Sequence, residues 1–427
     1  MSMFHNLRTI RRSMLLILPW VAVWAPPGFS APPPPAPRVF QISPSALAET
    51  KRRLLAGDKT LAPAMGRLGR EAEKALKEGP FTVTTATAKR PSGDPHDYIS
   101  LSTYFWPDPA KPDGLPWMRK DGQKNPEIDT PKYCKVPLSQ MAKHVTTLSL
   151  AWYLTGREEY AAHAATLLRV FFLAPATKMN PNLNFAQFVP GEKSPGRPSG
   201  IIDTHVLIEL VDAIGQLGGA AAWTSADQTG MEAWFSAYVD WLLTSKNGLG
   251  ESKAANNHGT WYDSQVVSFA LFARRTDLAK RVLAEAPAKR IATQIEADGA
   301  QPQELRRTKS FDYSLFNLNA LMTLATLGQA APADLWNYQS PKGGGIRKAL
   351  DWLVPYTIGG KPWQHQQITT FKPDSLFPLL RRAAIAYQSA EYERMAEKLA
   401  QDDPASRVNL VYPAPEKGQF STPPDRF

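Results

Sequence analysis

From Leu138 to Ala400, apolar residues recur with the period of an α-helix, and no alternating strand pattern interrupts them. Two more helical patterns precede this region, and the one strand candidate, residues 81–87, is short. Helices that follow one another without strands must bury their apolar faces against other helices, which predicts an all-α fold. The predicted helices cover 45–56, 61–77, 138–154, 158–173, 201–217, 230–243, 259–274, 277–296, 311–327, 346–353, 375–388 and 391–400.

Two pairs of these helices are joined by similar turns. Residues 154–160 and 272–278 each place basic side chains just before acidic ones. The similarity indicates an internal repeat of helical hairpins. Such repeats form an α/α toroid or a solenoid, in which loops at one rim carry the functional site.

The N-terminus has the pattern of a secretory signal peptide. Three arginines, at 8, 11 and 12, precede an apolar run over 14–25, and small residues at 28 and 30 favour cleavage after Ser30. The apolar run is too short to span a bilayer comfortably, and no later segment reads as a transmembrane helix. We expect a signal peptide over 1–30, a Pro-rich linker over 31–40, a single domain over 41–427, and a periplasmic or secreted protein.

Composition narrows the class of partner. The chain of 427 residues is 43% apolar and carries a formal charge of +10, which falls to +7 without the three signal-peptide arginines. A basic exported protein favours polyanionic partners such as acidic glycans. No basic run with interleaved aromatics indicates a nucleic-acid groove, so we expect no nucleic-acid partner. Cys134 is the single cysteine, so no internal disulfide can form.

The segment Asn256-Asn257-His258 stands where a helix is predicted to begin. Asn256 is a suitable N-cap, which would place Asn257 and His258 in the first turn. Free backbone N–H groups and the positive end of the helix dipole make such a turn a seat for a carboxylate. The alternative is a capped core helix with a buried structural histidine.

Three other segments carry candidate functional side chains. Arg306 and Arg307 precede a helix on which Tyr313 lies off the apolar stripe, so this tyrosine need not pack into the helix's core face. A long irregular region, 91–137, contains several aromatics. Asp203 stands at a helix start, where an N-cap role competes with a functional one. The aromatics considered for contact with sugar rings are Tyr104, Trp106 and Trp117.

Amide, imidazole, guanidinium and phenol groups together suit β-elimination in a uronic acid polymer. Removing the C5 proton, which is α to a carboxylate, builds negative charge that preorganised donors must stabilise. A base takes this proton, and an acid protonates the departing 4-oxygen. A tyrosine could do both if adjacent Arg and His groups lowered its pKa. Neither a metal nor an organic cofactor is then required.

These segments, taken in order, resemble the alginate lyase superfamily of polysaccharide lyases with incomplete (α/α) toroids. The resemblance is carried by residues 97–100 and 104–109, Gly200-Ile201-Ile202-Asp203-Thr204, Asn256-Asn257-His258, residues 301–308, and Ser310-Phe311-Asp312-Tyr313. It implies an incomplete (α/α) toroid of helical hairpins with long rim loops. It also implies that Asn257, His258, Arg307 and Tyr313 form the catalytic set. The spacing of six from Arg307 to Tyr313 is more similar to family thirty-eight, which acts on glucuronan, than to the classical alginate lyases of family five.

We therefore expect an exported lyase that cleaves a 1,4-linked uronic acid polymer, such as polymannuronate or glucuronan, to a 4,5-unsaturated product. Its partner is an acidic polysaccharide, and the sequence leaves the oligomeric state and endo or exo action open. Two alternatives stay open: a glycoside hydrolase that uses Asp203 with Glu304 or Asp312, and a periplasmic protein that only binds acidic glycans. The predicted substrate-binding residues are Tyr104, Trp106, Trp117, Asp203 and Arg306, and Arg306 competes with Arg307 as the functional guanidinium.

Overall fold

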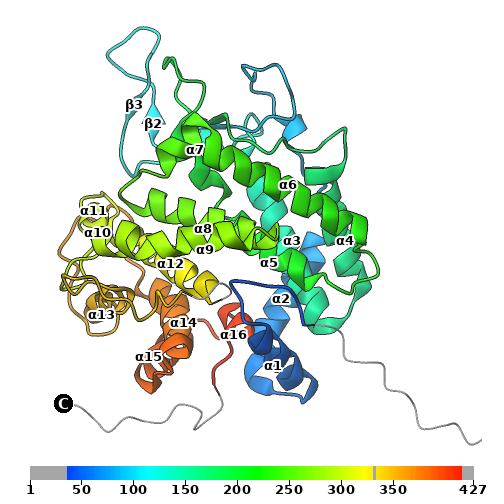
Figure 1. Ribbon diagram of the computed structural model, residues 1–427, viewed down its shortest axis with the longest axis vertical. Helices are drawn as coiled ribbons and strands as arrows, with labels where there is room; N and C mark the ends of the chain where they lie inside the picture. Colours follow the sequence, from blue (N-terminus) through cyan, green and yellow to red (C-terminus); the bar gives the residue numbers. More distant parts are fainter. Residues whose placement is uncertain (1–35, 330–332, 416–427) are drawn as a thin grey trace, which may run out of the picture. The chain divides into compact units, whose positions relative to one another are not determined.

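Helices make up most of the described chain, which comprises residues 36–329 and 333–415 of a computed structural model (Figure 1). The all-α class predicted from the sequence is confirmed. The predicted signal peptide and the first half of the predicted linker, residues 31–35, lie outside the described residues. The helices are α1 (Pro44–Leu55), α2 (Ala62–Ala75), α3 (Lys135–Thr155), α4 (Glu158–Leu168), α5 (Leu207–Gln216), α6 (Ser225–Thr244), α7 (Lys246–Glu251), α8 (Asn257–Phe272), α9 (Thr276–Ala286), α10 (Ala292–Gln294), α11 (Pro302–Leu305), α12 (Ser310–Gly328), α13 (Ile346–Thr357), α14 (Phe377–Tyr387), α15 (Ala390–Ala400) and α16 (Val408–Val411).

Helix α8 lies at the centre of the packing. It contacts α5, α6, α9 and α12, and Figure 1 shows it between α6 and α12. All of its residues except His258 are buried, so the helix has no solvent-exposed face. Several of its buried polar side chains are paired inside the core: Asp263, for example, accepts from the Arg290 Nε at 2.7 Å. A helix buried all round holds its first turn in a fixed position.

The two similar turns join helices as predicted. Helix α3 packs against α4, and α8 packs against α9. Each turn contains one residue in the left-handed region, Gly156 at φ 74° and Arg274 at φ 60°, which reverses the chain directly after the helix end. The predicted helices over 158–173 and 277–296 each continue beyond α4 or α9 into a π-helical turn, Arg169–Leu173 and Pro287–Ile291.

The strand predicted over 81–87 is wrong. Residues Val83–Thr85 form a 3₁₀ turn, which begins after Thr82, and the backbone carbonyls of Val83 and Ala86 each accept from the buried Arg90 guanidinium at 2.6 Å. Carbonyls occupied by a side chain cannot pair with a neighbouring strand. The β-propensity of the threonines is overridden by this local contact.

The strands that do form lie in and beside the long irregular region. β1 (Ile99–Leu101) pairs in parallel with β4 (Phe185–Phe188), and β2 (Phe105–Trp106) pairs antiparallel with β3 (Met118–Arg119). The second pair is a hairpin in which Phe105 faces Arg119 and Trp106 faces Met118. Figure 1 shows this hairpin projecting from the end of the molecule near α7.

Asp203, one of the predicted substrate-binding residues, connects the first pair of strands to the segment before α5. It lies in the 3₁₀ segment Pro198–Thr204, and its side chain is only 1% exposed. Its carboxylate accepts from the Ser100 hydroxyl at 2.6 Å, the Gln187 Nε2 at 2.9 Å and the Tyr98 hydroxyl at 3.1 Å. Both carboxylate oxygens thus have partners inside the protein, which ties the segments around residues 100, 187 and 203 together.

The two ends of the described chain pack against each other. Helix α16 contacts α1 and α2, and the Thr50 hydroxyl donates to the Leu410 carbonyl at 2.8 Å. Within residues 36–329 and 333–415, no helix is long and apolar enough to cross a membrane.

Candidate active site

Helix α8 begins where the sequence predicts, and its first turn carries two of the expected residues. Asn256 is the N-cap, with its Oδ1 accepting from the His258 backbone N–H at 3.3 Å. Asn257 and His258 follow as the first helical residues. Their position at the positive end of the helix dipole favours a negatively charged neighbour.

The negatively charged group at the start of α8 is the buried carboxylate of Glu304, on α11. Its Oε1 accepts from the Asn257 backbone N–H, and its Oε2 accepts from the Asn257 Nδ2, both at 2.7 Å. Burial raises the pKa of Glu304 above its usual value. The bonds from Asn257 and the charges of Arg307 and His258 oppose this rise but do not cancel it. Because Arg307 and His258 both act on this carboxylate, two motifs about fifty residues apart in the sequence meet around Glu304.

The Asn257 side chain is more enclosed than the sequence predicts. The residue is 1% exposed, and its Oδ1 is buried without a hydrogen-bond partner in the part of the chain that the structure describes. A buried acceptor without a donor is costly, so a sugar hydroxyl reaching it would relieve that cost. Contact with a ligand requires a small movement of this amide.

His258 is the one residue of α8 that is not buried. Its Nδ1 lies 2.6 Å from Oε1 of Glu251, the last residue of α7. The imidazole side chain is 23% exposed, while the Glu251 side chain is almost fully enclosed. A neutral imidazole that donates its Nδ1–H to this carboxylate keeps its lone pair on Nε2, which is then the nitrogen free for proton transfer.

Arg307 is held by a carboxylate that the sequence analysis did not identify. Asp121, from the loop after β3, accepts from the Arg307 Nη2 at 2.8 Å and Nε at 3.1 Å. The Thr308 hydroxyl donates to the same carboxylate at 3.1 Å. Burial of Asp121 opposes its ionisation, but the Arg307 and Thr308 contacts outweigh burial and hold the pKa of Asp121 well below its usual range. The Arg307 side chain is 14% exposed, and its Nη1 has no hydrogen-bond partner among the described residues.

Tyr313 lies directly beneath this guanidinium. The Arg307 Cζ is 3.7 Å from the centroid of the Tyr313 ring, a close cation–π contact. The Tyr313 hydroxyl is 2.7 Å from the Tyr104 hydroxyl, so the structure brings together two tyrosines that are 209 residues apart in the sequence.

The pKa of Tyr313 moves in the opposite direction from the one expected. Burial raises it above the ordinary tyrosine value, and Tyr104 adds to the rise, while Arg307 lowers it by a smaller amount. Desolvation of a phenolate therefore outweighs the attraction of one guanidinium. Tyr313 is a neutral phenol at pH 7, ready to donate a proton.

The other predicted aromatics lie on the β2–β3 hairpin. Tyr104 lies in the turn directly before β2, and Trp106 is the second residue of that strand. The Trp106 Nε1 donates to the Gln123 carbonyl at 2.9 Å, and the Lys120 Nζ is 5.7 Å from its ring. Trp117, at the other side of the hairpin, is half-buried, and its backbone N–H donates to the Pro190 carbonyl at 3.0 Å.

The structure separates the two adjacent arginines. Arg306 is exposed, and its side chain makes no ion pair or hydrogen bond with the described part of the protein. Arg307 instead stacks on Tyr313. Of the two candidates, Arg307 is the guanidinium that belongs to this cluster.

Asp121 and Glu251 are the site residues that the sequence analysis missed. A signal for Asp121 was available in the Asp-Gly pair at 121–122, because Gly122 has φ 74°. A Cβ on Gly122 would lie 2.3 Å from the Thr308 hydroxyl oxygen, so only glycine lets this loop approach the start of α12. Among the described residues, no three His, Cys, Asp or Glu side chains gather as metal ligands would.

Comparison with known proteins identifies the family. Residues 82–363 match the profile of the family described as alginate lyase. An alginate lyase from Bacteroides ovatus, known from its crystal structure, is 40% identical, with 88% of this chain and 99% of that chain covered and a TM-score of 0.84. No curated protein matches the chain.

More distant structures share the fold. Alginate lyase A1-III from Sphingomonas species A1 is 16% identical over 88% of this chain and 97% of its own, with a TM-score of 0.57. A histidine-to-alanine variant of A1-III in complex with a tetrasaccharide is 15% identical over 87% of this chain and 94% of its own, with a TM-score of 0.54. The (α/α)-toroid fold predicted from the sequence is confirmed.

Replacing Asp121 tests whether it anchors the loop after β3. In Asp121→Asn, the charge-assisted bonds to Arg307 and Thr308 are lost, each worth about 1.5–3 kcal/mol. We expect amide hydrogen exchange in residues 118–123 to accelerate at least about tenfold, with global unfolding little changed.

The matched control is Asp129→Asn, which removes an exposed ion pair with Lys124 from the same irregular region. Exposed pairs contribute little, so exchange in 118–123 should stay at the wild-type rate. Unchanged protection of 118–123 in Asp121→Asn would show that the loop is held by other contacts.

Proposed function

Because the chain belongs to the alginate lyase family and is a polysaccharide lyase, we propose that it cleaves a 1,4-linked uronic acid polymer, polymannuronate or glucuronan, by β-elimination. The observation that carries this proposal is the stack of Arg307 on Tyr313, whose hydroxyl lies against Tyr104. It places a cation and a proton donor within one side-chain length of each other, as elimination next to a carboxylate requires.

Charge stabilisation is the first requirement of the reaction. Loss of the C5 proton spreads a second negative charge over the sugar carboxylate, and fixed donors lower the free energy of that state. Arg307 can offer its unpaired Nη1 to the carboxylate while Asp121 holds its other edge. The Asn257 amide is bonded to Glu304, and the charge of His258 acts on the same carboxylate, so we add these two groups to the set of donors.

Proton transfer is the second requirement, and it depends on stereochemistry. In mannuronate and glucuronate residues the C5 proton and the 4-oxygen share a face, so Tyr313 both accepts the proton and protonates the leaving oxygen. In guluronate residues they lie on opposite faces, and His258 Nε2 takes the proton while Tyr313 remains the acid. The Glu251 carboxylate keeps the His258 lone pair on Nε2 and stabilises the imidazolium that forms.

Asp121 and Glu304 are positioning residues in this proposal. Asp121 fixes the plane of the Arg307 guanidinium through two parallel bonds, a geometry with high directional specificity. Glu304 fixes Asn257 in the same way. Preorganisation of this kind removes the cost of aligning donors during the reaction.

The two alternative functions have less support. A glycoside hydrolase needs two carboxyl groups across the scissile bond. Asp203 and Glu304 are both buried and bonded within the protein, and Asp312 accepts from the Thr369 hydroxyl at 2.8 Å. A protein that only binds glycans has no need of a buried phenol beneath a guanidinium.

The aromatic hairpin supports a role in substrate binding. Tyr104 contacts Tyr313 directly, and Trp106 lies two residues further along, in β2. Both rings are half-exposed, so each has a face available for stacking on a sugar. We assign Trp117 a weaker contribution because its backbone is tied to Pro190 and its side chain packs partly against the core.

Substitution of Tyr313 tests the proposal directly. Tyr313→Phe keeps the ring under Arg307 but removes the proton donor, and general acid–base catalysis contributes about 10²–10⁴-fold. We expect elimination, followed by the ultraviolet absorbance of the unsaturated product, to fall at least about 100-fold on polymannuronate and glucuronan. Tyr153→Phe is the control: this tyrosine lies on α3, its hydroxyl has no hydrogen-bond partner among the described residues, and the variant should keep wild-type activity. Full activity of Tyr313→Phe on every uronan would remove Tyr313 from the mechanism.

The pH dependence should differ between substrates. As a base, Tyr313 must be a phenolate, and because its pKa lies above the ordinary value of about 10, the phenolate fraction rises tenfold per pH unit below that pKa. The kcat/KM on polymannuronate should therefore increase steadily between about pH 7 and pH 9. On polyguluronate Tyr313 acts as the acid, so no such increase is expected. Parallel profiles on the two polymers would contradict this assignment of roles.

Export rests on the sequence alone and is a separate proposal. The predicted signal peptide ends at Ser30, so a bacterial host that expresses the full chain should release a protein that begins at Ala31 into its periplasm or medium. N-terminal mass spectrometry of the fractions measures this. A chain that keeps residues 1–30 and stays in the cytoplasmic fraction would contradict export.

A further inference from the structure

A cavity lies far from the proposed active site, at the other end of α12. It has a volume of about 1190 Å³ and is bounded by the segment before α1, the C-terminal end of α12, helix α14 and the segment after α16. Tyr313 and Thr326 are thirteen residues apart on the same helix, which corresponds to about 20 Å along its axis. Figure 1 shows α1, α14 and α16 at the end of the molecule opposite the β2–β3 hairpin.

Arg382 on α14 is the charged group of this cavity. The residue is only 5% exposed, yet within residues 36–329 and 333–415 no carboxylate lies within salt-bridge distance of its guanidinium. Its Nη1 donates to the Asn319 Oδ1 at 2.7 Å and its Nη2 donates to the Thr326 hydroxyl at 3.3 Å, both neutral acceptors. Its Nε is buried without any partner in the described chain. Burial lowers the pKa of Arg382, and the charge of Glu209, which lies beyond salt-bridge distance, opposes this only in part. A buried cation without a direct ion pair is costly, and an anionic ligand would offset that cost.

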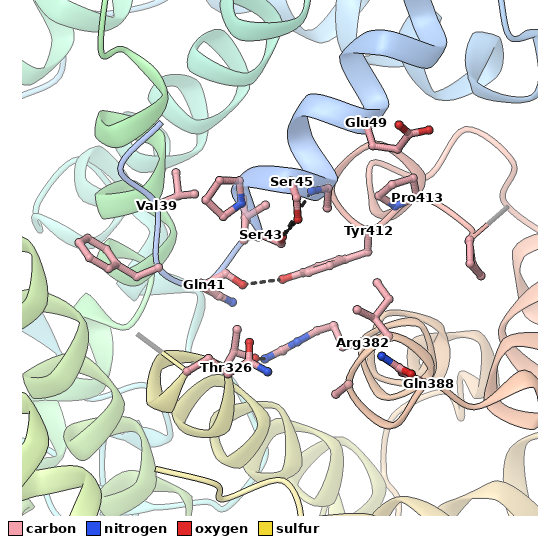
Figure 2. Close-up of a pocket in the computed structure, with 18 of the residues that line it drawn as sticks. Val39, Gln41, Ser43, Ser45, Glu49, Thr326, Arg382, Gln388, Tyr412 and Pro413 are labelled. Atoms are coloured by element: carbon pink, nitrogen blue, oxygen red, sulfur yellow. Dashed lines mark hydrogen bonds between the residues drawn. The ribbon is translucent and has the colours of Figure 1, made fainter. Parts of the chain in front are cut away.

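Two further polar atoms at the cavity wall are also unpaired. The Gln41 Oε1 and the Trp336 Nε1 are buried and have no hydrogen-bond partner among the described residues. Figure 2 shows Gln41 and Tyr412 on one side of the cavity, joined by a long hydrogen bond, with Thr326 and Arg382 facing them. The cavity is therefore lined by three residues with an unpaired polar atom: an acceptor on Gln41, a neutral donor on Trp336 and a cationic donor on Arg382.

We propose that this cavity binds a small hydroxylated carboxylate, a sugar acid, with its carboxylate on Arg382 and its hydroxyls on the neutral polar groups. Gln41 Oε1 would accept from a ligand hydroxyl, while Trp336 Nε1 would donate to one. A polyhydroxylated ring satisfies donors and acceptors together, which a simple inorganic anion cannot do.

The rest of the wall fits one negative charge and a ring. Tyr412 and Trp336 supply aromatic surface, and Gln388 and Thr326 supply neutral polar groups. Glu49 also lines the cavity, with its carboxylate bonded to Arg52 at 2.6 and 2.7 Å, and it would repel a ligand with several negative charges. The volume exceeds the usual range of small-molecule sites, about 300–1,000 Å³, and so admits one or two sugar rings.

The anionic class of the ligand follows from the cavity, and the choice of a sugar acid rests in addition on the proposed function, because uronan cleavage releases such molecules. The binding measurement below does not depend on catalysis. Its failure therefore leaves the proposed function intact, and loss of the proposed function leaves the cavity's affinity for an anion to be measured.

Calorimetric titration of the full chain tests the proposal. The probes are sodium glucuronate, glucose and inorganic phosphate, each added to the Tyr313→Phe variant so that the proposed active site is catalytically silent. We expect saturable binding of glucuronate and at least about tenfold weaker binding of glucose, because glucose lacks the charge that pairs with Arg382. Arg382→Met in the same background should lose glucuronate binding about tenfold or more. The matched control is Arg394→Met, an exposed arginine on α15, which should bind like the parent.

Several other results of this titration would contradict the proposed sugar-acid site. Equal binding of glucuronate and glucose, or binding that Arg382→Met leaves unchanged, would overturn the proposal. Binding of phosphate alone would overturn the assignment to a sugar acid and leave a small inorganic-anion site. If Arg382→Met does not fold, as judged by circular dichroism, Gln41→Met provides the second variant, and unaltered glucuronate affinity in that variant would also count against the proposal.

Discussion

The carboxylate of Glu304 joins the two parts of the chain that make the proposed active site. It receives two hydrogen bonds from Asn257, at the start of the helix that the whole core surrounds, and it stands three residues before Arg307. Bonds to a buried charge of this kind are worth about 1.5–3 kcal/mol each, and losing one partner leaves an uncompensated charge in the interior. The paired hydrogen bonds between Glu304 and Asn257 therefore fix the distance between the first turn of α8 and the turn that carries Arg307.

Around the Glu304–Asn257 contact, the other residues of the site contact one another in pairs. Glu251 orients His258, Asp121 orients Arg307, and Arg307 covers the ring of Tyr313, which in turn touches Tyr104. His258 and Arg307 are thus each held by a carboxylate that takes no direct part in the proposed reaction. A site in which charged groups are already paired costs little to maintain without substrate, and it still offers Nη1 of Arg307 to a sugar carboxylate.

The sequence predicted what depends on local pattern. Helix periodicity located the helices, and the Asn256 cap located the first turn of α8, because apolar spacing and N-cap chemistry are properties of neighbouring residues. The two hairpin turns and the choice of Asn257, His258, Arg307 and Tyr313 as a group also came from the sequence, the last through family resemblance.

Contacts between distant residues could not be predicted in that way. Asp121 and Arg307 are 186 residues apart, and nothing in either segment indicates the other. The strand expected over 81–87 did not form because the buried Arg90 guanidinium donates to its carbonyls. The burial of Asp203 was not predicted because its partners come from other segments of the chain. The direction of the Tyr313 pKa depends on burial, which a sequence does not display.

The central claim is that Arg307, His258 and Tyr313 act on one sugar residue. A crystal structure of Tyr313→Phe soaked with a short oligomannuronate tests it most directly. The account predicts one carboxylate within hydrogen-bond distance of the Arg307 Nη1, with the C5 carbon of the same residue over the ring at position 313. An oligosaccharide bound elsewhere, or one whose carboxylates all lie beyond reach of Arg307, would contradict it.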